Sequence, residues 1–366
     1  KDLMKLVANK TEVPAKIPQY DGLERWELLE KMGAGGFSTV YRARDLDGKA
    51  GEVAIKVVPK SGMKQVQHAN IAREVQIMRQ LDNPNIIKFI DFSESRQFYY
   101  LILELAPGGE LFHQILRLKY FSEDLSRHII LQVAKALEYL HEEKGIMHRD
   151  IKLENILFSP IPFIPSKHQQ PPQLNEEDKV DEGEFIAGIG SGCIGQIKIA
   201  DFGLSKMVQN DETATPCGTV GYAAPEIVKD EPYSMSVDIW ALGCVLYMLL
   251  CGFPPFYGAD KNDLTKKVAV GQFTFQSPWW DDISRSAQDL ISHSLTVDPD
   301  KRYTIHEFLS HPWIRVDRST STSERGVMPG GMLRAVDVSN HVGSGEHCDL
   351  PSLSVIKLHS VFNNSY

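Results

Sequence analysis

Hydrophobic and polar residues alternate in the first part of the chain, which is typical of strands with one buried face. Residues 26–58 alternate in this way around a cluster of glycines, and residues 86–92 and 98–105 form two more strand-like runs. Between these runs, residues 71–81 have helical spacing and good helix-forming residues. The pattern therefore predicts a small sheet with one main helix over residues 26–106.

The hydrophobic period changes after the prolyl-glycyl-glycine sequence at residues 107–109. Helical spacing then recurs at residues 126–142, 236–250, 286–295 and 304–309. A chain of 366 residues is long enough for two lobes with cores of their own. The sequence thus predicts an α+β fold, with a small mainly-β N-lobe at residues 26–106 and a larger mainly-α C-lobe at residues 107–313.

Three segments lack a sustained hydrophobic period. Residues 159–196 carry prolines, then an acidic cluster, then a glycine-rich stretch. We expect this segment to be a mobile insertion that buries no core. Residues 1–25 are expected to form an N-terminal extension, and residues 314–366, which are rich in serine and glycine, a loosely ordered or regulatory tail.

Composition narrows the classes of function. A net charge of −9 without a basic cluster argues against nucleic-acid binding, although it suits a basic protein partner. The five scattered cysteines lack metal-ligand spacing and indicate reduced thiols in a cytoplasmic or nuclear protein. The longest apolar run, residues 239–253, is too short to cross a membrane and predicts a buried helix. We therefore expect a monomer with no membrane or nucleic-acid partner.

A glycine-rich turn lies between the first two predicted strands, at residues 33–40. Glycines let backbone amides approach phosphate oxygens without interference from Cβ atoms. By itself the turn is equally typical of a plain hairpin. The lysine of a P-loop is absent and no helix opens at the turn, which argues against P-loop and dinucleotide-binding sites.

Lys56 is the one charged residue in the apolar sequence VAIK at residues 53–56. A buried charge needs a partner. Glu74, on the following predicted helix, is the natural partner and would leave the ammonium group near phosphate oxygens. The alternative is a solvent-exposed lysine on an edge strand.

Polar residues gather in the sequence HRDIKLEN at residues 148–155. The carboxylate of Asp150 could accept a hydroxyl proton, and Lys152 could neutralise a transferring phosphoryl group. The amide oxygen of Asn155 could bind Mg²⁺, and Asp201, in the sequence DFG after a predicted strand, offers a second oxygen ligand.

In this order the motifs resemble those of eukaryotic protein kinases from about residue 26 to residue 313. Three further features strengthen the resemblance: the sequence APE at residues 224–226, the sequence DIW at residues 238–240, and Arg302. The resemblance implies the bilobal protein kinase fold and a Mg²⁺- and ATP-dependent phosphotransferase.

The resemblance also implies roles for the polar residues. Lys56 and Glu74 would form the ion pair that holds the α- and β-phosphates of ATP. Asp150 would be the catalytic base, with Lys152 beside the γ-phosphate. Asn155 and Asp201 would hold Mg²⁺.

The same resemblance assigns an ATP-binding surface. Its loop would comprise Met32, Gly33, Ala34, Gly35, Gly36, Phe37, Ser38, Thr39 and Val40. The adenine would lie among Val40, Ala54 and Leu157, with Leu103 guarding the pocket and Glu104 to Ala106 forming the hinge. A hydrophobic column of Met78, Phe89, His148 and Phe202 would join the lobes.

Two positions depart from the kinase pattern. Ser38 replaces the third glycine of the loop, and Leu153 stands where proline is usual. Neither change removes a catalytic group, so we expect an active enzyme. A catalytically weak nucleotide-binding scaffold is the alternative from another functional class.

Lys152 and Thr219 match the serine/threonine class of protein kinases, in which the threonine bridges Asp150 and the lysine. Glu110 and Glu154 match acidic positions that receive an arginine upstream of the target residue in basophilic kinases. Carboxylates suit a guanidinium group. The alternative is that both are merely solvated acids.

Thr215 lies where this family carries an activating phosphate, which Arg149 could bind. Because Pro216 follows and no arginine precedes it closely, we expect an upstream proline-directed MAP kinase to phosphorylate Thr215. The alternatives are that Pro216 only shapes the loop and that the threonine is modified in cis or not at all.

Within the kinases, the chain resembles the calmodulin-dependent group and, through its long insertion, MAP-kinase-activated fungal stress kinases of the Rck type. The tail shows no convincing basic amphipathic helix for calmodulin, since its arginines are broken up by proline and glycine. A calmodulin-regulated kinase nevertheless stays the main alternative.

Overall fold

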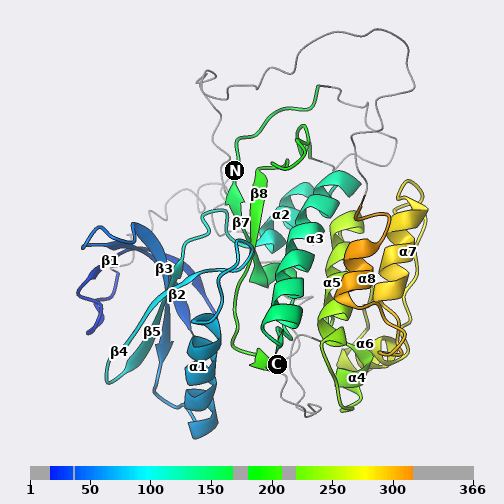
Figure 1. Ribbon diagram of the computed structural model, residues 1–366. Helices are drawn as coiled ribbons and strands as arrows, with labels where there is room; N and C mark the ends of the chain where they lie inside the picture. Colours follow the sequence, from blue (N-terminus) through cyan, green and yellow to red (C-terminus); the bar gives the residue numbers. More distant parts are fainter. Residues whose placement is uncertain (1–16, 36–37, 168–179, 208–219, 316–366) are drawn as a thin grey trace, which may run out of the picture. The chain divides into compact units, whose positions relative to one another are not determined.

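The computed structural model of the chain describes residues 17–35, 38–167, 180–207 and 220–315. These residues form two compact units (Figure 1). Unit 1 comprises the residues up to 81 together with 87–105, and unit 2 comprises 82–86 and the residues from 106 onward. Unit 1 is mainly β and unit 2 mainly α, so the predicted α+β kinase fold is confirmed.

Unit 1 is built on one antiparallel sheet with the strand order β1-β2-β3-β5-β4. Its strands are β1 (Trp26–Ala34), β2 (Thr39–Asp45), β3 (Glu52–Pro59), β4 (Phe89–Glu94) and β5 (Phe98–Glu104). The strand expected from residue 86 begins only at Phe89, because Ile86 belongs to unit 2 and bridges Ile199 there.

Alternation along the strands gives the sheet two apolar faces. On one face, Ile55 and Tyr100 are buried in a core with Trp26. On the other face, Val58 and Leu101 pack with Val75 from α1 (Gln65–Met78). This helix begins six residues before the predicted start at residue 71. The hydrophobic pattern missed the first turn because that turn is polar. The start is instead set by the Gln67 side chain, which accepts the Lys64 N–H at 2.7 Å.

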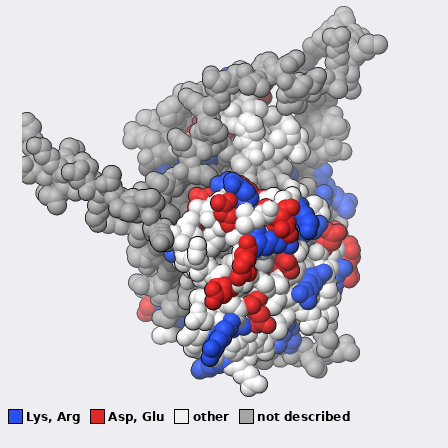
Figure 2. Space-filling model, turned by 90° about the vertical axis from the view of Figure 1, so that its left-hand side faces the viewer, with Lys and Arg blue, Asp and Glu red and all other residues white. Residues whose placement is uncertain are grey.

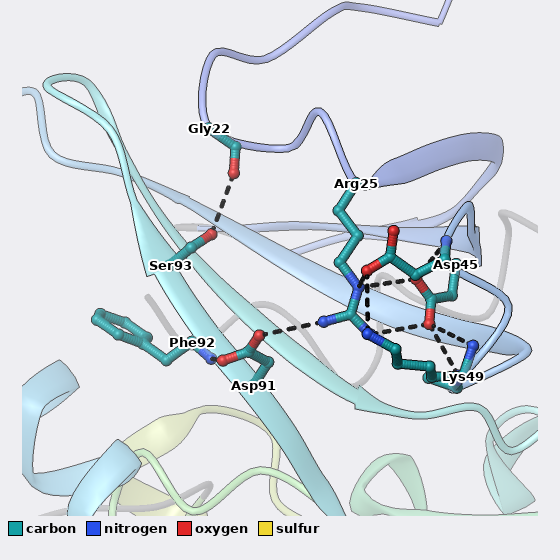
Figure 3. A network of polar contacts seen from close by, with 9 residues as sticks. Gly22, Arg25, Asp45, Lys49, Asp91, Phe92 and Ser93 are labelled. Carbon is teal, nitrogen blue, oxygen red and sulfur yellow. Dashed lines mark hydrogen bonds and ion pairs between the residues drawn. The ribbon is translucent and has the colours of Figure 1, made fainter.

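Residues 17–25 pack on the first face of the sheet and are part of unit 1. Leu23 is only 4% exposed within the core that contains Trp26. Arg25 donates two hydrogen bonds of 2.8 Å to the buried Asp45 (Figure 3). This guanidinium holds the pKa of the Asp45 carboxyl well below its usual range. The ordered unit thus begins before residue 26, where the sequence pattern placed its start.

Opposite charges are interspersed on the surface of unit 1. Arg42 lies 3.0 Å from Glu30 and 2.6 Å from Glu52, and Arg44 lies 3.3 Å from Glu27. The face of the molecule in Figure 2 likewise shows lysine and arginine among aspartate and glutamate. Such exposed pairs contribute little to stability individually.

Unit 2 is mainly helical and also holds two small antiparallel sheets. Its helices are α2 (Leu111–Leu118), α3 (Glu123–Glu138), α4 (Pro225–Val228), α5 (Ser236–Cys251), α6 (Lys261–Ala269), α7 (Arg285–Ser294) and α8 (Ile305–Ser310). A π-helical turn, Tyr139–Glu143, follows α3, and a short 3-10 turn spans Leu153–Asn155. The sheets pair β6 (Ile146–Met147) with β9 (Lys206–Met207) and β7 (Ile156–Pro160) with β8 (Ile194–Ile199).

Helix α5 is buried from Val237 to its last residue, Cys251, as expected for a core helix. In the part of the chain that the structure describes, helices long and apolar enough to cross a membrane do not occur.

The segment at residues 159–196 departs from expectation, because its later part packs onto α2 and α3. The Glu182 carboxylate accepts the Ser122 N–H at 2.9 Å, and Arg117 donates to the Gly192 carbonyl at 2.8 Å. A Cβ atom on Gly192 would lie 3.0 Å from Leu118. The prediction that this segment buries no core is therefore wrong for residues 182–183 and 190–195, which are buried. The residues that make these contacts do not recur with a regular spacing, so the hydrophobic pattern of the sequence did not reveal them.

Candidate active site

Lys56 and Glu74 form an ion pair in unit 1. The Lys56 Nζ lies 2.9 Å from Glu74 Oε1, and the two side chains are 17% and 3% exposed. Strand β3 lies between β2 and β5, which excludes the alternative of an edge-strand lysine. Each buried charge offsets the other, so the ammonium group stays fixed at a defined place on the sheet.

The predicted ATP-binding residues of unit 1 share a face of the sheet with Lys56. Val40 pairs with Lys56 across β2 and β3, and Ala54 pairs with Leu103 across β3 and β5. Because alternate residues point to the same face, Val40, Ala54 and Leu103 flank the lysine. The neighbouring turn is closed by the Gly35 N–H, which donates to the Ser38 carbonyl at 2.8 Å.

Most of the remaining residues of the predicted ATP-binding surface lie at the ends of strands or outside the described residues. Met32 to Ala34 end β1, Thr39 opens β2, and Glu104 ends β5. Ala106 is the first residue of the continuous part of unit 2. Gly36 and Phe37 lie outside the described residues.

In unit 2, Asp238 on α5 holds the backbone of the segment HRD. Its carboxylate accepts the N–H groups of His148 at 2.9 Å and Arg149 at 2.8 Å. Burial opposes the charge of Asp238, but the nearby His141, 2.8 Å away, and the backbone donors outweigh it and lower the pKa of this carboxyl. Arg149 takes a positive φ of 69°, so this clamp offsets local backbone strain.

Asp150 is held by two of the predicted catalytic residues. Its Oδ2 lies 2.9 Å from Lys152 Nζ and accepts a hydrogen bond of 2.8 Å from Asn155 Nδ2. Burial disfavours the charge of Lys152, but nearby carboxylates, foremost Asp150, outweigh it and raise the pKa of the ammonium group. The cation therefore remains charged at neutral pH beside Asp150.

Asp201 follows β8 and is brought close to Asn155 by the backbone. The Ala200 N–H donates to the Asn155 carbonyl at 2.9 Å, and Asp201 itself has a positive φ of 62°. Both side-chain hydrogen bonds of Asn155 use Nδ2, which leaves its amide oxygen as a ligand atom. This oxygen and the Asp201 carboxylate are the hard donors that Mg²⁺ prefers, so the residues fit the ion.

The four residues of the predicted hydrophobic column occur as two from each unit. In unit 2, the rings of His148 and Phe202 are 4.9 Å apart at 70°. Burial lowers the pKa of His148, which favours a neutral ring there. In unit 1, Met78 is buried and Phe89 packs against the core of Val58.

These arrangements agree with the comparison to known proteins, in which residues 26–314 match the family described as the protein kinase domain. The chain belongs to the protein kinase family. It is 59% identical over 83% of its length to Serine/threonine-protein kinase srk1 of Schizosaccharomyces pombe. It is 57% identical over 82% to Calcium/calmodulin-dependent protein kinase type II of the same yeast, and 44% identical over 82% to Serine/threonine-protein kinase RCK2 of Saccharomyces cerevisiae. The chain spans 54% to 59% of the length of these three relatives.

Protein kinases in general use ATP and Mg²⁺. In this kinase, Asn155 and Asp201 would hold the metal ion, which neutralises phosphate charge when bound.

The kinase also carries the predicted pair of acidic residues, Glu110 and Glu154. Glu110 precedes α2 and its backbone bridges Leu157 on β7. Burial first, and then the negative charge of Glu154, raise the pKa of Glu110 to about 7. Because the charge of Glu110 is unfavourable beside Glu154, an incoming cation between the two carboxylates would stabilise the ionised form of Glu110.

Arg149, the predicted phosphate-binding residue of the kinase, contacts Leu204 and Tyr233, which lie before and after Thr215 in the sequence. Its Nη1 donates to Tyr233 Oη at 2.8 Å, and its Nε donates to the Leu204 carbonyl. Thr215 and Thr219 lie outside the described residues. Sequence reasoning missed the Asp238 clamp, although one acidic residue opening an otherwise apolar helix was the signal for it.

Proposed function

We propose that this kinase transfers the γ-phosphoryl group of ATP to serine or threonine hydroxyls of proteins, preferentially where an arginine lies upstream. The observation that carries the proposal is the arrangement at Asp150, whose carboxylate is held by Lys152 and Asn155 at 2.9 and 2.8 Å. That arrangement fixes a proton acceptor beside a permanent cation, which is what transfer to a hydroxyl requires.

Each residue then has one task. Asp150 orients the substrate hydroxyl and accepts its proton, while Lys152 stabilises the negative charge of the transferring group. Lys56, fixed by Glu74, binds phosphate oxygens of ATP. The serine/threonine specificity is supported by Lys152 and by the printed names of srk1 and RCK2.

The preference for arginine rests on Glu110 and Glu154. A guanidinium group between two carboxylates forms charge-assisted hydrogen bonds and removes their mutual repulsion. A neutral side chain at the same position of the substrate would neither form charge-assisted hydrogen bonds with the two carboxylates nor reduce their repulsion.

Activation is proposed to come from a MAP kinase of a stress-signalling cascade that phosphorylates Thr215. Pro216 suits a proline-directed kinase, and Asp211 and Glu212 make the preceding residues unsuitable for this kinase itself. The phosphate would pair with Arg149 and order the loop around it.

The deciding experiment measures phosphate transfer to a serine peptide with an upstream arginine, before and after treatment with an active stress MAP kinase. A peptide with alanine in place of arginine and the variant Thr215→Ala serve as controls. We expect activation only in the chain that carries Thr215, and a higher kcat/KM for the arginine peptide. A rate that is high before treatment and equal in Thr215→Ala would refute activation at this residue.

Calmodulin regulation is the second candidate, because one relative at 57% identity carries calmodulin in its printed name. Adding Ca²⁺ and calmodulin to the untreated kinase tests it. An increase in rate that chelation of Ca²⁺ reverses would favour this mode of control over Thr215.

A further inference from the structure

Helix α2 carries one member of the acidic pair, Glu110 and Glu154, at its start. Glu110 is the N-cap residue of α2, and Glu154 lies in the 3-10 turn Leu153–Asn155, against which the helix packs. The helix has eight residues and therefore extends about 12 Å. A backbone that is hydrogen-bonded over about two turns moves as one body, so a shift of its last turn also shifts Glu110.

The first turn of α2 is held by β7. The Gly108 N–H donates to the Phe158 carbonyl at 3.0 Å, and the Phe158 N–H donates to the Gly109 carbonyl at 3.2 Å. A Cβ atom on Gly108 would lie 2.4 Å from the Phe158 ring, so the two segments are in close contact. Strand β7 also follows directly after the turn that carries Glu154. The start of α2 is thus tied to the same strand as Glu154.

The last turn of α2 is held by the insertion. The half-buried Arg117 donates from Nη2 to the Gly192 carbonyl at 2.8 Å and from Nε to Gln114 Oε1, also at 2.8 Å. Gln114 is only 2% exposed. The planar guanidinium group therefore links the buried side of α2 to the insertion through two donors of fixed geometry.

Gly192 is itself fixed within the insertion. Its N–H donates to the Glu182 carbonyl at 2.5 Å, and the Glu182 carboxylate accepts the Ser122 N–H before α3. A Cβ atom on Gly192 would lie 3.0 Å from Leu118 and 3.4 Å from Leu125, and its φ of 61° favours glycine. The insertion thus contacts both the end of α2 and the start of α3 (Figure 1).

We propose that Arg117 and the insertion position Glu110 beside Glu154 and thereby set the preference of the kinase for an arginine upstream of the target hydroxyl. This inference rests on the proposed function. Arg117 is a positioning residue, because it acts through α2. Without the hydrogen bond to Gly192 the last turn of α2 is less constrained, and the two carboxylates are no longer held at the spacing that suits one guanidinium group. The reaction at Asp150 does not use this contact.

The experiment compares the serine peptide that has an upstream arginine with the peptide that has alanine in its place. The full chain is first treated with an active MAP kinase, which is then removed. In Arg117→Ala we expect the KM for the arginine peptide to rise by about three- to tenfold, because part of a charge-assisted interaction is lost. The kcat for this peptide and the kcat/KM for the alanine peptide should change by less than about twofold. Gly192→Ala, which alters the same contact from the insertion, should raise the same KM.

Further variants separate positioning from folding. Arg117→Lys keeps the charge but not the two donors of the guanidinium group, and should be intermediate. Arg117→Ala combined with Glu110→Gln should raise the KM no further than Glu110→Gln alone, because the acidic pair is then already incomplete. Arg285→Ala, at an exposed arginine of α7, is the matched control and should behave as the original chain. The urea midpoint of each variant shows that it is folded in the assay.

The outcomes separate the two hypotheses. If the original chain has the same kcat/KM for both peptides, the arginine preference of the proposed function fails and the inference fails with it. If the preference is present and both Arg117→Ala and Gly192→Ala retain it, the inference alone is refuted. The inference is also refuted by a loss of kcat that is equal for both peptides, or by a rise in KM that persists in the Glu110→Gln background, because Arg117 would then only support the fold of unit 2.

Discussion

At the residue scale, a substitution of Asp150 tests the catalytic step separately from nucleotide binding. Replacing Asp150 by asparagine keeps the size of the side chain but removes the proposed proton acceptor. We expect kcat to fall by about 10²- to 10⁴-fold, since general base catalysis contributes this much. The Kd of an ATP analogue should change little, because Lys56 and Glu74 are untouched.

Steady-state kinetics and a nucleotide-binding titration measure the two quantities. Asp282→Asn, at an exposed aspartate, is the control and should leave both unchanged. A kcat within a few-fold of the original value in Asp150→Asn would remove Asp150 from the role of base.

The second prediction at this scale concerns the pH dependence of substrate binding at Glu110. The pKa of this carboxyl is raised to about 7 by burial and by Glu154. The carboxyl is mostly neutral at pH 6 and mostly ionised at pH 8, so it attracts an arginine more strongly at the higher pH. The KM for an arginine peptide should therefore fall as the pH rises from 6 to 8. Lys152, which opposes the shift, and His113, 3.9 Å away, are further charged or titratable neighbours of Glu110 among the described residues.

Three controls isolate the Glu110 charge. The peptide with alanine in place of arginine should show a flat KM, Glu110→Gln should flatten the KM for the arginine peptide, and His113→Gln should retain the slope. An unchanged slope in Glu110→Gln would assign the pH dependence to another group.

At the scale of elements, Glu182 joins the insertion to α3. Its carboxylate accepts the Ser122 N–H, while the Ser122 hydroxyl accepts the Leu125 N–H and caps the helix. A carboxylate at a helix N-terminus interacts favourably with the helix dipole. Glu182→Ala should therefore destabilise unit 2 by about 1–2 kcal/mol and speed hydrogen exchange in the first turn of α3.

The matched control is Glu184→Ala, because Glu184 pairs with the exposed Lys167 and should contribute less. Equal exchange rates in the first turn of α3 for the original chain and Glu182→Ala would show that the insertion does not support this helix.

Some features of these elements could be predicted from the sequence and others could not. The pairing of Lys56 with Glu74 was predictable, since a charge in an apolar strand requires a counter-ion. The start of α1 was not, because side-chain hydrogen bonding of Gln67 decides it rather than hydrophobic spacing. The positive φ of Asp201 and the packing of Gly192 against α2 depend on tertiary contacts between residues distant in sequence. Candidate catalytic residues could be proposed from the sequence because their chemistry restricts the residue type, whereas no such restriction marks a structural residue such as Asp238.

At the scale of the whole molecule, the question is where the stable folded chain begins. The family match starts at residue 26, yet residues 17–25 contribute to the core of unit 1. Figure 3 shows two ties of this segment: Arg25 reaches Asp45, and the Gly22 carbonyl accepts a hydrogen bond of 3.3 Å from the Ser93 hydroxyl. These ties connect the segment to β2 and β4 at once.

A chain that begins at Trp26 should consequently be less stable than one that begins at Ile17. Losing the buried Leu23 side chain alone removes about 2 kcal/mol. The difference in stability is measured as the urea concentration at the unfolding midpoint of unit 1, with hydrogen exchange in β1 and β3 as the probe of unfolding. Leu23→Ala in the longer chain should reproduce part of the loss.

Asp45 adds a pH dependence to this comparison. Because Arg25 lowers the pKa of the Asp45 carboxyl, their interaction stabilises the fold above the ordinary aspartate pKa of about 4 and is lost as the pH falls further. The shorter chain lacks Arg25, so the gap in stability between the two chains should narrow below about pH 4. The apolar part of the gap, from Leu23, should persist at every pH. Equal urea midpoints for both chains at pH 7 would mean that the fold of unit 1 is complete from Trp26 onward.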